Sequence, residues 1–123
     1  MIRKMEPEDT SKCCNLLMDN LNEWGSISGT GVSEPTVIEM LEMYMSRSSK
    51  VVLVNDDLSG LIMGGIFKWP LNLEKYGLQE IICVGENRDE LRDALDLWGK
   101  KSGCEAAVMS CFEKSASDRI RRL

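Results

Sequence analysis

The sequence contains no histidine among its 123 residues. This absence excludes Ser-His-Asp and Cys-His catalysis in their usual forms, and it removes the commonest metal ligand. A general base in this chain must therefore be a carboxylate, a lysine, a tyrosine, a thiol or a water molecule.

The cysteines form no recognisable framework. Their number is odd and none of them has C-x-x-C spacing, whereas disulfide scaffolds and zinc sites use even or closely spaced sets. We therefore expect no metal site, and we interpret the cysteines as small buried side chains in a reducing cytoplasm. The five are Cys13, Cys14, Cys83, Cys104 and Cys111.

Long apolar runs and an excess of positive charge are also missing. No stretch approaches the roughly 18 apolar residues of a membrane helix, and the start "MIRKMEPEDT" lacks the apolar core of a signal peptide. With 15 basic and 20 acidic residues, the net charge of −5 does not favour nucleic acid or anionic lipid. We expect a cytoplasmic protein with a single domain, residues 1–123, and no nucleic-acid or membrane partner.

What the sequence does contain is an alternation of strand and helix patterns. β-branched and apolar runs predict strands, and apolar residues spaced by three and four predict helices. The predicted strands cover 1–6, 50–57, 61–69, 78–84 and 105–112, and the predicted helices begin near 9, 33, 87 and 115, with loops at 24–33 and 71–77. Gly64 and Gly65 predict a bulge or a close backbone approach inside the third strand. The order β-α-α-β-β-β-α-β-α predicts an α/β fold with a mixed central sheet flanked by helices.

These elements resemble the GCN5-related N-acetyltransferase (GNAT) superfamily. "IRKMEPED" is similar to the family's opening strand, and "VVLVNDDLSGLIMGGIF" to its second and third strands. "LQEIICV" is similar to strand four, and "SGCEAAVMSC" to the end of helix three and the start of strand five. The resemblance covers nearly the whole chain and implies a GNAT-like domain that is reduced and lacks the C-terminal strands.

The resemblance implies a position for acetyl-CoA as co-substrate. In the family, strands four and five splay apart and the pantetheine arm pairs with the backbone of strand four, here Ile82, Cys83 and Val84. The pyrophosphate lies at the start of helix three, here Asn87, Arg88 and Asp89. The acceptor is a small-molecule or peptide amine that attacks the thioester directly.

The segment "GENRDELRDAL" departs from the family pattern. It is about six residues short and lacks the Gly-x-Gly element, since Leu91 and Asp93 stand where the glycines would follow. Asn87 and Glu90 could form a capping box, which would leave fewer N–H groups for a phosphate. Two interpretations stay open at this point: a capped surface helix, or a shortened but working cofactor loop.

The end of the chain departs as well. Ile120 stands where the family has a tyrosine that protonates the departing thiolate, and the family's last two strands do not follow. The strand at 105–112 would then have an open edge, which predicts a homodimer paired through it.

Two further residues are candidates for catalysis. Period-2 alternation places Glu80 on the same face as Ile82 and Val84, and a carboxylate beside an apolar cleft suits a base. Tyr76, in the loop before the fourth strand, could contact the acceptor or donate a proton. The alternatives are a solvent-facing glutamate and a surface aromatic. The sequence thus predicts an N-acetyltransferase; the other hypothesis is an inactive GNAT-fold protein, of a kind seen in phage genomes, that binds a protein partner.

Overall fold

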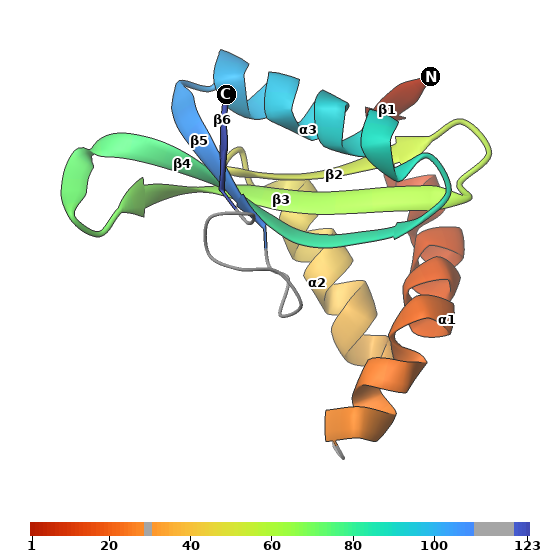
Figure 1. Cartoon of the computed structure of the whole chain (residues 1–123). Coiled ribbons are helices and arrows are strands. Elements are labelled where there is room, and N and C mark those ends of the chain that lie inside the picture. Colours follow the sequence, from red (N-terminus) through yellow and green to blue (C-terminus); the bar gives the residue numbers. More distant parts are fainter. Residues whose placement is uncertain (29–30, 110–119) are drawn as a thin grey trace.

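The computed structural model describes residues 1–28, 31–109 and 120–123. The described strands form one six-stranded sheet in sequential order, with α1 and α2 on one face and α3 on the other (Figure 1). All neighbouring strands are antiparallel except β4 and β5, which are parallel and joined by α3. The elements are β1 (Ile2–Lys4), the 3-10 helix η1 (Pro7–Asp9), α1 (Thr10–Ser28), α2 (Glu34–Ser46), β2 (Lys50–Asn55), β3 (Gly60–Trp69), β4 (Asn72–Gly85), α3 (Arg88–Lys101), β5 (Cys104–Met109) and β6 (Ile120–Arg122). The predicted α/β fold with a mixed sheet is confirmed.

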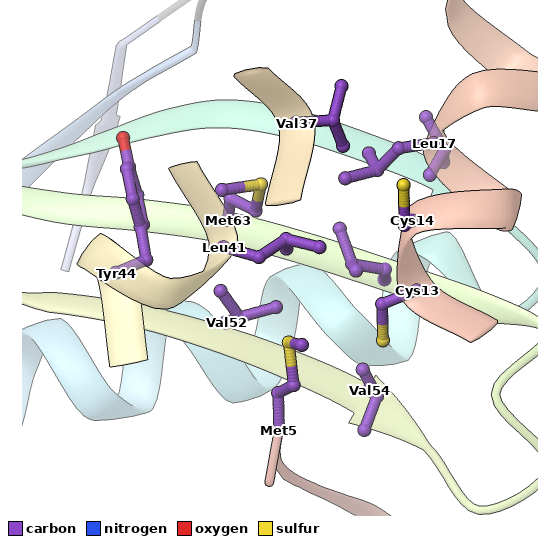
Figure 2. Close-up of a cluster of buried hydrophobic side chains, with 12 residues drawn as sticks. Met5, Cys13, Cys14, Leu17, Val37, Leu41, Tyr44, Val52, Val54 and Met63 are labelled. Atoms are coloured by element: carbon purple, nitrogen blue, oxygen red, sulfur yellow. The ribbon is translucent and has the colours of Figure 1, made fainter. Parts of the chain in front are cut away.

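The sheet is buried on both faces, which explains its continuous apolar runs. In β2, Val52 and Val54 face α1 and α2, whereas Val51 and Leu53 face α3. Figure 2 shows the first of these two cores, where side chains from both helices meet those of the central strands. Cys13 and Cys14 lie in this core as small buried side chains, as predicted.

On the other face, α3 packs closely because glycine makes room for leucine. A Cβ on Gly64 would lie 2.7 Å from a methyl carbon of Leu95, and a Cβ on Gly99 would lie 2.8 Å from one of Leu78. The predicted close approach at Gly64 is therefore confirmed. Within the described residues, no helix has the length and apolar character needed to span a bilayer.

Two predicted loops are wrong in part. Helix α1 continues to Ser28, so residues 24–28 are helical although they contain Gly25 and two serines. Strand β4 begins at Asn72, and most of the predicted 71–77 loop belongs to a long β3–β4 hairpin. The outer part of this hairpin extends beyond the helices (Figure 1), so it has no buried face that would impose an apolar alternation.

The C-terminal prediction also needs correction. Residues 115–119 of the expected last helix lie outside the described residues, but Ile120–Arg122 form β6 rather than helix. β6 pairs with residues 106–108, so a C-terminal strand is present and covers this part of the β5 edge. The open edge that suggested a homodimer is thus closed there, and the homodimer itself stays a prediction.

Candidate functional site

Among the described residues, the pairing of β4 with β5 covers only the middle of β4. The parallel ladder runs from Tyr76 opposite Cys104 to Glu80 opposite Met109. The rest of β4, residues 81–85, has no β5 partner among the described residues. The chain that follows Met109 lies outside the described residues, so the predicted splay is described on the β4 side alone.

A β-bulge occurs where this ladder stops. Met63 pairs with Ile82, whereas the next residue of β3, Gly64, pairs with Glu80, so Ile81 is the extra residue. The bulge reverses the alternation of β4 at this point. Ile82 and Val84 pack toward α1 and α2, but Glu80 reaches Arg92 on α3. The predicted common face for Glu80, Ile82 and Val84 is therefore wrong, because alternation holds only in an unbroken strand.

The three residues predicted to hold the pantetheine arm follow this bulge directly. Ile82 and Cys83 are half-buried and Val84 is buried. Their strand is hydrogen-bonded to β3 on one side. On the other side their backbone has no strand partner in the part of the chain that the structure describes.

The start of α3 differs from the predicted cap. Asn87 is the N-cap residue, but it has the left-handed conformation, with φ 60°, and its side chain makes no capping hydrogen bond. The predicted capping box with Glu90 is wrong. Leu91 donates its N–H to the Asn87 carbonyl, whereas the N–H groups of residues 88–90 have no hydrogen-bond acceptor among the described residues. This helix end consequently presents N–H groups to solvent.

The loop before α3 is fixed against the β2–β3 turn. Glu86 donates its N–H to the Ser59 carbonyl at 3.0 Å, and Arg88 Nε donates to the Gly85 carbonyl at 3.1 Å. Gly85 has φ +82°, and a Cβ there would lie 2.0 Å from the Ser59 carbonyl oxygen. A Cβ on Gly60 would likewise lie 2.0 Å from the Glu86 carbonyl oxygen. Sequence reasoning missed this backbone-to-backbone contact, for which the paired glycines were the available signal.

The charges around the helix start are mixed. Glu86, Asp89 and Glu90 are exposed within one turn of the helix start, beside the single cation Arg88. Acidic residues stabilise a helix N-terminus, but they repel a phosphate placed there. The N–H groups fit a pyrophosphate, whereas the side-chain charge opposes one.

The two predicted catalytic residues are not brought together. Glu80 is 3% exposed and accepts hydrogen bonds from Arg92 Nε at 3.1 and 3.2 Å, one to each carboxylate oxygen. Tyr76 lies in β4 rather than in a loop, is 43% exposed, and pairs with Lys68 and Cys104. Four residues of strand separate Tyr76 from Glu80, which is about 13 Å. No group of three acidic or cysteine side chains suited to a metal occurs among the described residues.

No protein-family model matches the chain, and no curated protein matches it in sequence. Solved structures do match in fold. Glucosamine-6-phosphate N-acetyltransferase from Arabidopsis thaliana aligns with a TM-score of 0.65 and 18% identity, over 90% of this chain and 81% of that one. A predicted acetyltransferase with acetyl-CoA from Clostridium acetobutylicum aligns with a TM-score of 0.70 and 10% identity, over 90% and 80%. This chain has the GNAT fold.

Proteins with different described roles share this fold. A transcriptional regulator from Bacillus halodurans C-125 aligns with a TM-score of 0.72 and 10% identity, over 90% of this chain and 81% of that one. At these identities the likeness concerns the fold, so the activity of this chain has to be argued from its own site.

Proposed function

We propose that this chain is an N-acetyltransferase that uses acetyl-CoA and a primary amine of a small molecule or peptide. The observation that carries the proposal is the junction of β4 and α3. There, a half-buried stretch of strand that continues beyond the described β4–β5 ladder leads directly into a helix start with unengaged N–H groups. An extended thioester arm needs the first feature and a pyrophosphate needs the second.

In this proposal the backbone of β4 binds the extended arm. Ile82 and Val84 offer N–H and C=O groups along the edge of β4 that faces β5, beyond the last described pair of the ladder, and Cys83 lies between them. Their half-buried side chains exclude water from one side of the arm. The N–H groups of Asn87, Arg88 and Asp89 then bind the pyrophosphate, and Arg88 offsets part of its charge.

Acetyl-CoA supplies the acetyl thioester: the amine nitrogen forms the new amide bond, the carbon–sulfur bond breaks, and coenzyme A leaves as a thiolate, which is protonated from solvent once the amine proton has been released. Glu80 is the proposed base, which receives the amine proton through a water molecule. Arg92 Nε donates to both of its carboxylate oxygens and so orients the carboxylate. Tyr76 is too far along β4 to share this proton transfer, so its proposed role is contact with the acceptor.

A thermal-shift titration with acetyl-CoA tests the proposal. Cofactor at 100 times its Kd should stabilise the fold by about 2.7 kcal/mol, which raises Tm by roughly 10 °C for a domain of this size. Desulfo-coenzyme A should give a similar shift, because the same arm and phosphates bind without the reactive sulfur. The proposal fails if millimolar acetyl-CoA leaves Tm unchanged.

A matched pair of variants tests the position of the pyrophosphate. Glu90→Gln removes one negative charge from the first turn of α3, so acetyl-CoA should bind about fivefold more tightly, corresponding to roughly 1 kcal/mol. Glu74→Gln removes the same charge from the exposed β3–β4 hairpin, far along β4 from the helix start. It should change the Kd by less than twofold. Equal effects of the two substitutions would contradict the assignment.

A second function, binding of a protein partner by an inactive GNAT fold, is favoured by the β3–β4 hairpin. Leu71 and Leu73 are 101% and 65% exposed near its tip, and Phe67 packs edge-on against Trp69 beside them. Exposed apolar side chains grouped in this way are typical of interaction surfaces. The thermal-shift titration separates the two functions, because only the transferase requires the cofactor.

A further inference from the structure

A second pocket lies away from the β4–α3 junction. It has a volume of about 210 Å³ and opens where β1 ends beside β2, between the C-terminal end of α2 and Trp98 of α3. Trp98 is ten residues beyond Arg88, so about 15 Å of helix separates this pocket from the proposed phosphate position. The two sites therefore do not overlap.

The charge around this pocket is of one sign. Lys4, Arg47 and Lys50 contribute to its lining, and no acidic residue does. None of these three forms an ion pair within the described residues. The chain as a whole has more acidic than basic residues, 20 against 15, so a group of three unpaired cations is not expected from composition.

The end of α2 explains only part of this cluster. Arg47 is the C-cap residue of α2, where the helix dipole favours a cation. Lys4 comes from β1 and Lys50 from β2, so three separate elements bring positive charge to the same opening. The hydroxyl groups of Ser46 and Ser48 also line the pocket and add hydrogen-bonding capacity.

Aromatic and apolar side chains also line the pocket beside the cations, among them Tyr44, Val52 and Trp98. Lys50 Nζ lies 4.8 Å from the centre of the Tyr44 ring, a cation–π contact that orients the ammonium group. Tyr44 itself is buried at the margin of the core drawn in Figure 2.

We propose that this pocket binds a small organic anion, with a phosphate or carboxylate group held by Lys4, Arg47 and Lys50 and a short carbon body against Tyr44 or Trp98. The volume limits the ligand, since pockets for drug-sized molecules start near 300 Å³. The cations favour the anionic group, and the aromatic side chains beside them can contact the carbon that carries it. This inference does not depend on acetyl transfer.

Phenyl phosphate, benzoate and phenol are suitable probes, because they share one ring and differ in charge. Calorimetric titration at low salt should give saturable binding of at least one of the two anions, at least tenfold tighter than that of phenol. The stronger of the two anions identifies the preferred group. Amide chemical-shift changes in a labelled sample should concentrate at residues 46–52. Changes concentrated at residues 85–90 would instead place the anion at the α3 start and overturn the proposal.

A charge-matched control completes the test. Arg47→Gln combined with Lys50→Gln should weaken binding of the preferred anion at least tenfold, whereas Lys101→Gln, which removes a cation outside the pocket lining, should change it less than twofold. Circular dichroism and Tm establish that the double variant is folded. Equal binding by the double variant and the control, or no saturable binding of either anion, would overturn the proposal.

Discussion

Arg92 Nε donates to both carboxylate oxygens of Glu80, at 3.1 and 3.2 Å, and so joins α3 to β4 at the bulge. The Glu80 side chain is 4% exposed and that of Arg92 is 29% exposed, so the pair is largely removed from water. It links the strand proposed to hold the thioester arm to the helix proposed to hold the phosphates.

Removing Arg92 should destabilise the fold more than neutralising Glu80. Arg92→Leu leaves a buried carboxylate without its arginine partner, which should cost about 2 kcal/mol, less than for a fully buried pair because Arg92 is partly exposed. Glu80→Gln leaves the more exposed arginine, which water can reach, so its cost should be smaller. Urea unfolding of the two variants measures the difference. If the Glu80 variant were the less stable, the ion pair would not be the main interaction at this point.

Glu80→Gln should also separate catalysis from cofactor binding. If Glu80 accepts the amine proton, turnover should fall by a factor of about 100 or more, while the Tm shift with acetyl-CoA stays unchanged. Release of coenzyme A, followed with a thiol reagent in the presence of a polyamine or peptide amine, measures turnover. Unchanged turnover would exclude Glu80 as the base and leave water or another group in that role.

Glycines on either side of α3, Gly85 before it and Gly103 after it, are needed for different reasons. Gly85→Ala would place a methyl group 2.0 Å from the Ser59 carbonyl and would force alanine to φ +82°, so it should cost about 3 kcal/mol or more. Gly103 is the matched control, because its φ is +93° but a Cβ there meets nothing within 4 Å. Gly103→Ala should therefore cost only about 1 to 2 kcal/mol from backbone strain. Chemical denaturation measures both, and equal costs would show that the contact with Ser59 is not decisive.

The sequence predicted the central strands and helices because their periodicity is imposed by burial. β2, β3 and the second half of β4 are mostly apolar on both faces. Helix α2 begins at Glu34, with Ser33 as its N-cap and Pro35 in its first turn, as expected. The outer hairpin gave no such signal, since exposed strands are held by backbone hydrogen bonds that carry little side-chain preference. β6 has only three residues, which are too few for an alternation to be recognised.

The candidate site was predictable in location but not in geometry. The motifs placed β4 and the start of α3 correctly, whereas the bulge at Ile81 redirected Glu80 to the α3 face. A single extra residue in one strand reverses every later side chain; Gly64 and Gly65 on β3 correctly predicted a bulge here, but not that its extra residue lies in β4. The left-handed conformation of Asn87 had the same effect on the cap, because it turns the side chain away from the first N–H groups.

The cysteines should differ sharply in reactivity. Burial raises the pKa of the Cys13 thiol to about 11, and it raises the pKa of Cys14 and Cys104 as well, whereas Cys83 is half-buried. In a Cys111→Ser background, iodoacetamide at pH 8 should therefore label Cys83 first, as read by peptide mass spectrometry.

Because the folded pKa of Cys13 is raised, its contribution to stability is complete below about pH 8.5 and declines as pH rises toward 11. Cys13→Ala should show a smaller decline over this range, and early labelling of Cys13 would contradict its burial.

Acid should weaken the fold through Asp9. Arg3 donates to both carboxylate oxygens of Asp9, at 2.7 and 3.2 Å, and Glu6 donates its backbone N–H at 2.9 Å. The Arg3 hydrogen bonds, followed by the Glu6 N–H, hold the pKa of Asp9 below its usual range. Because the folded pKa is lowered, this stability is present above about pH 5 and is lost as pH falls through about 3.9 toward the lowered pKa. Asp9→Asn should therefore lower the free energy of unfolding at pH 7 by about 1 to 2 kcal/mol, which is read as a lower urea midpoint. The substitution should also reduce the difference in urea midpoint between pH 7 and pH 3. Asp19→Asn, on the exposed face of α1, is the matched control and should leave both quantities nearly unchanged; an equal effect of the two substitutions would show that the Arg3 contact contributes nothing.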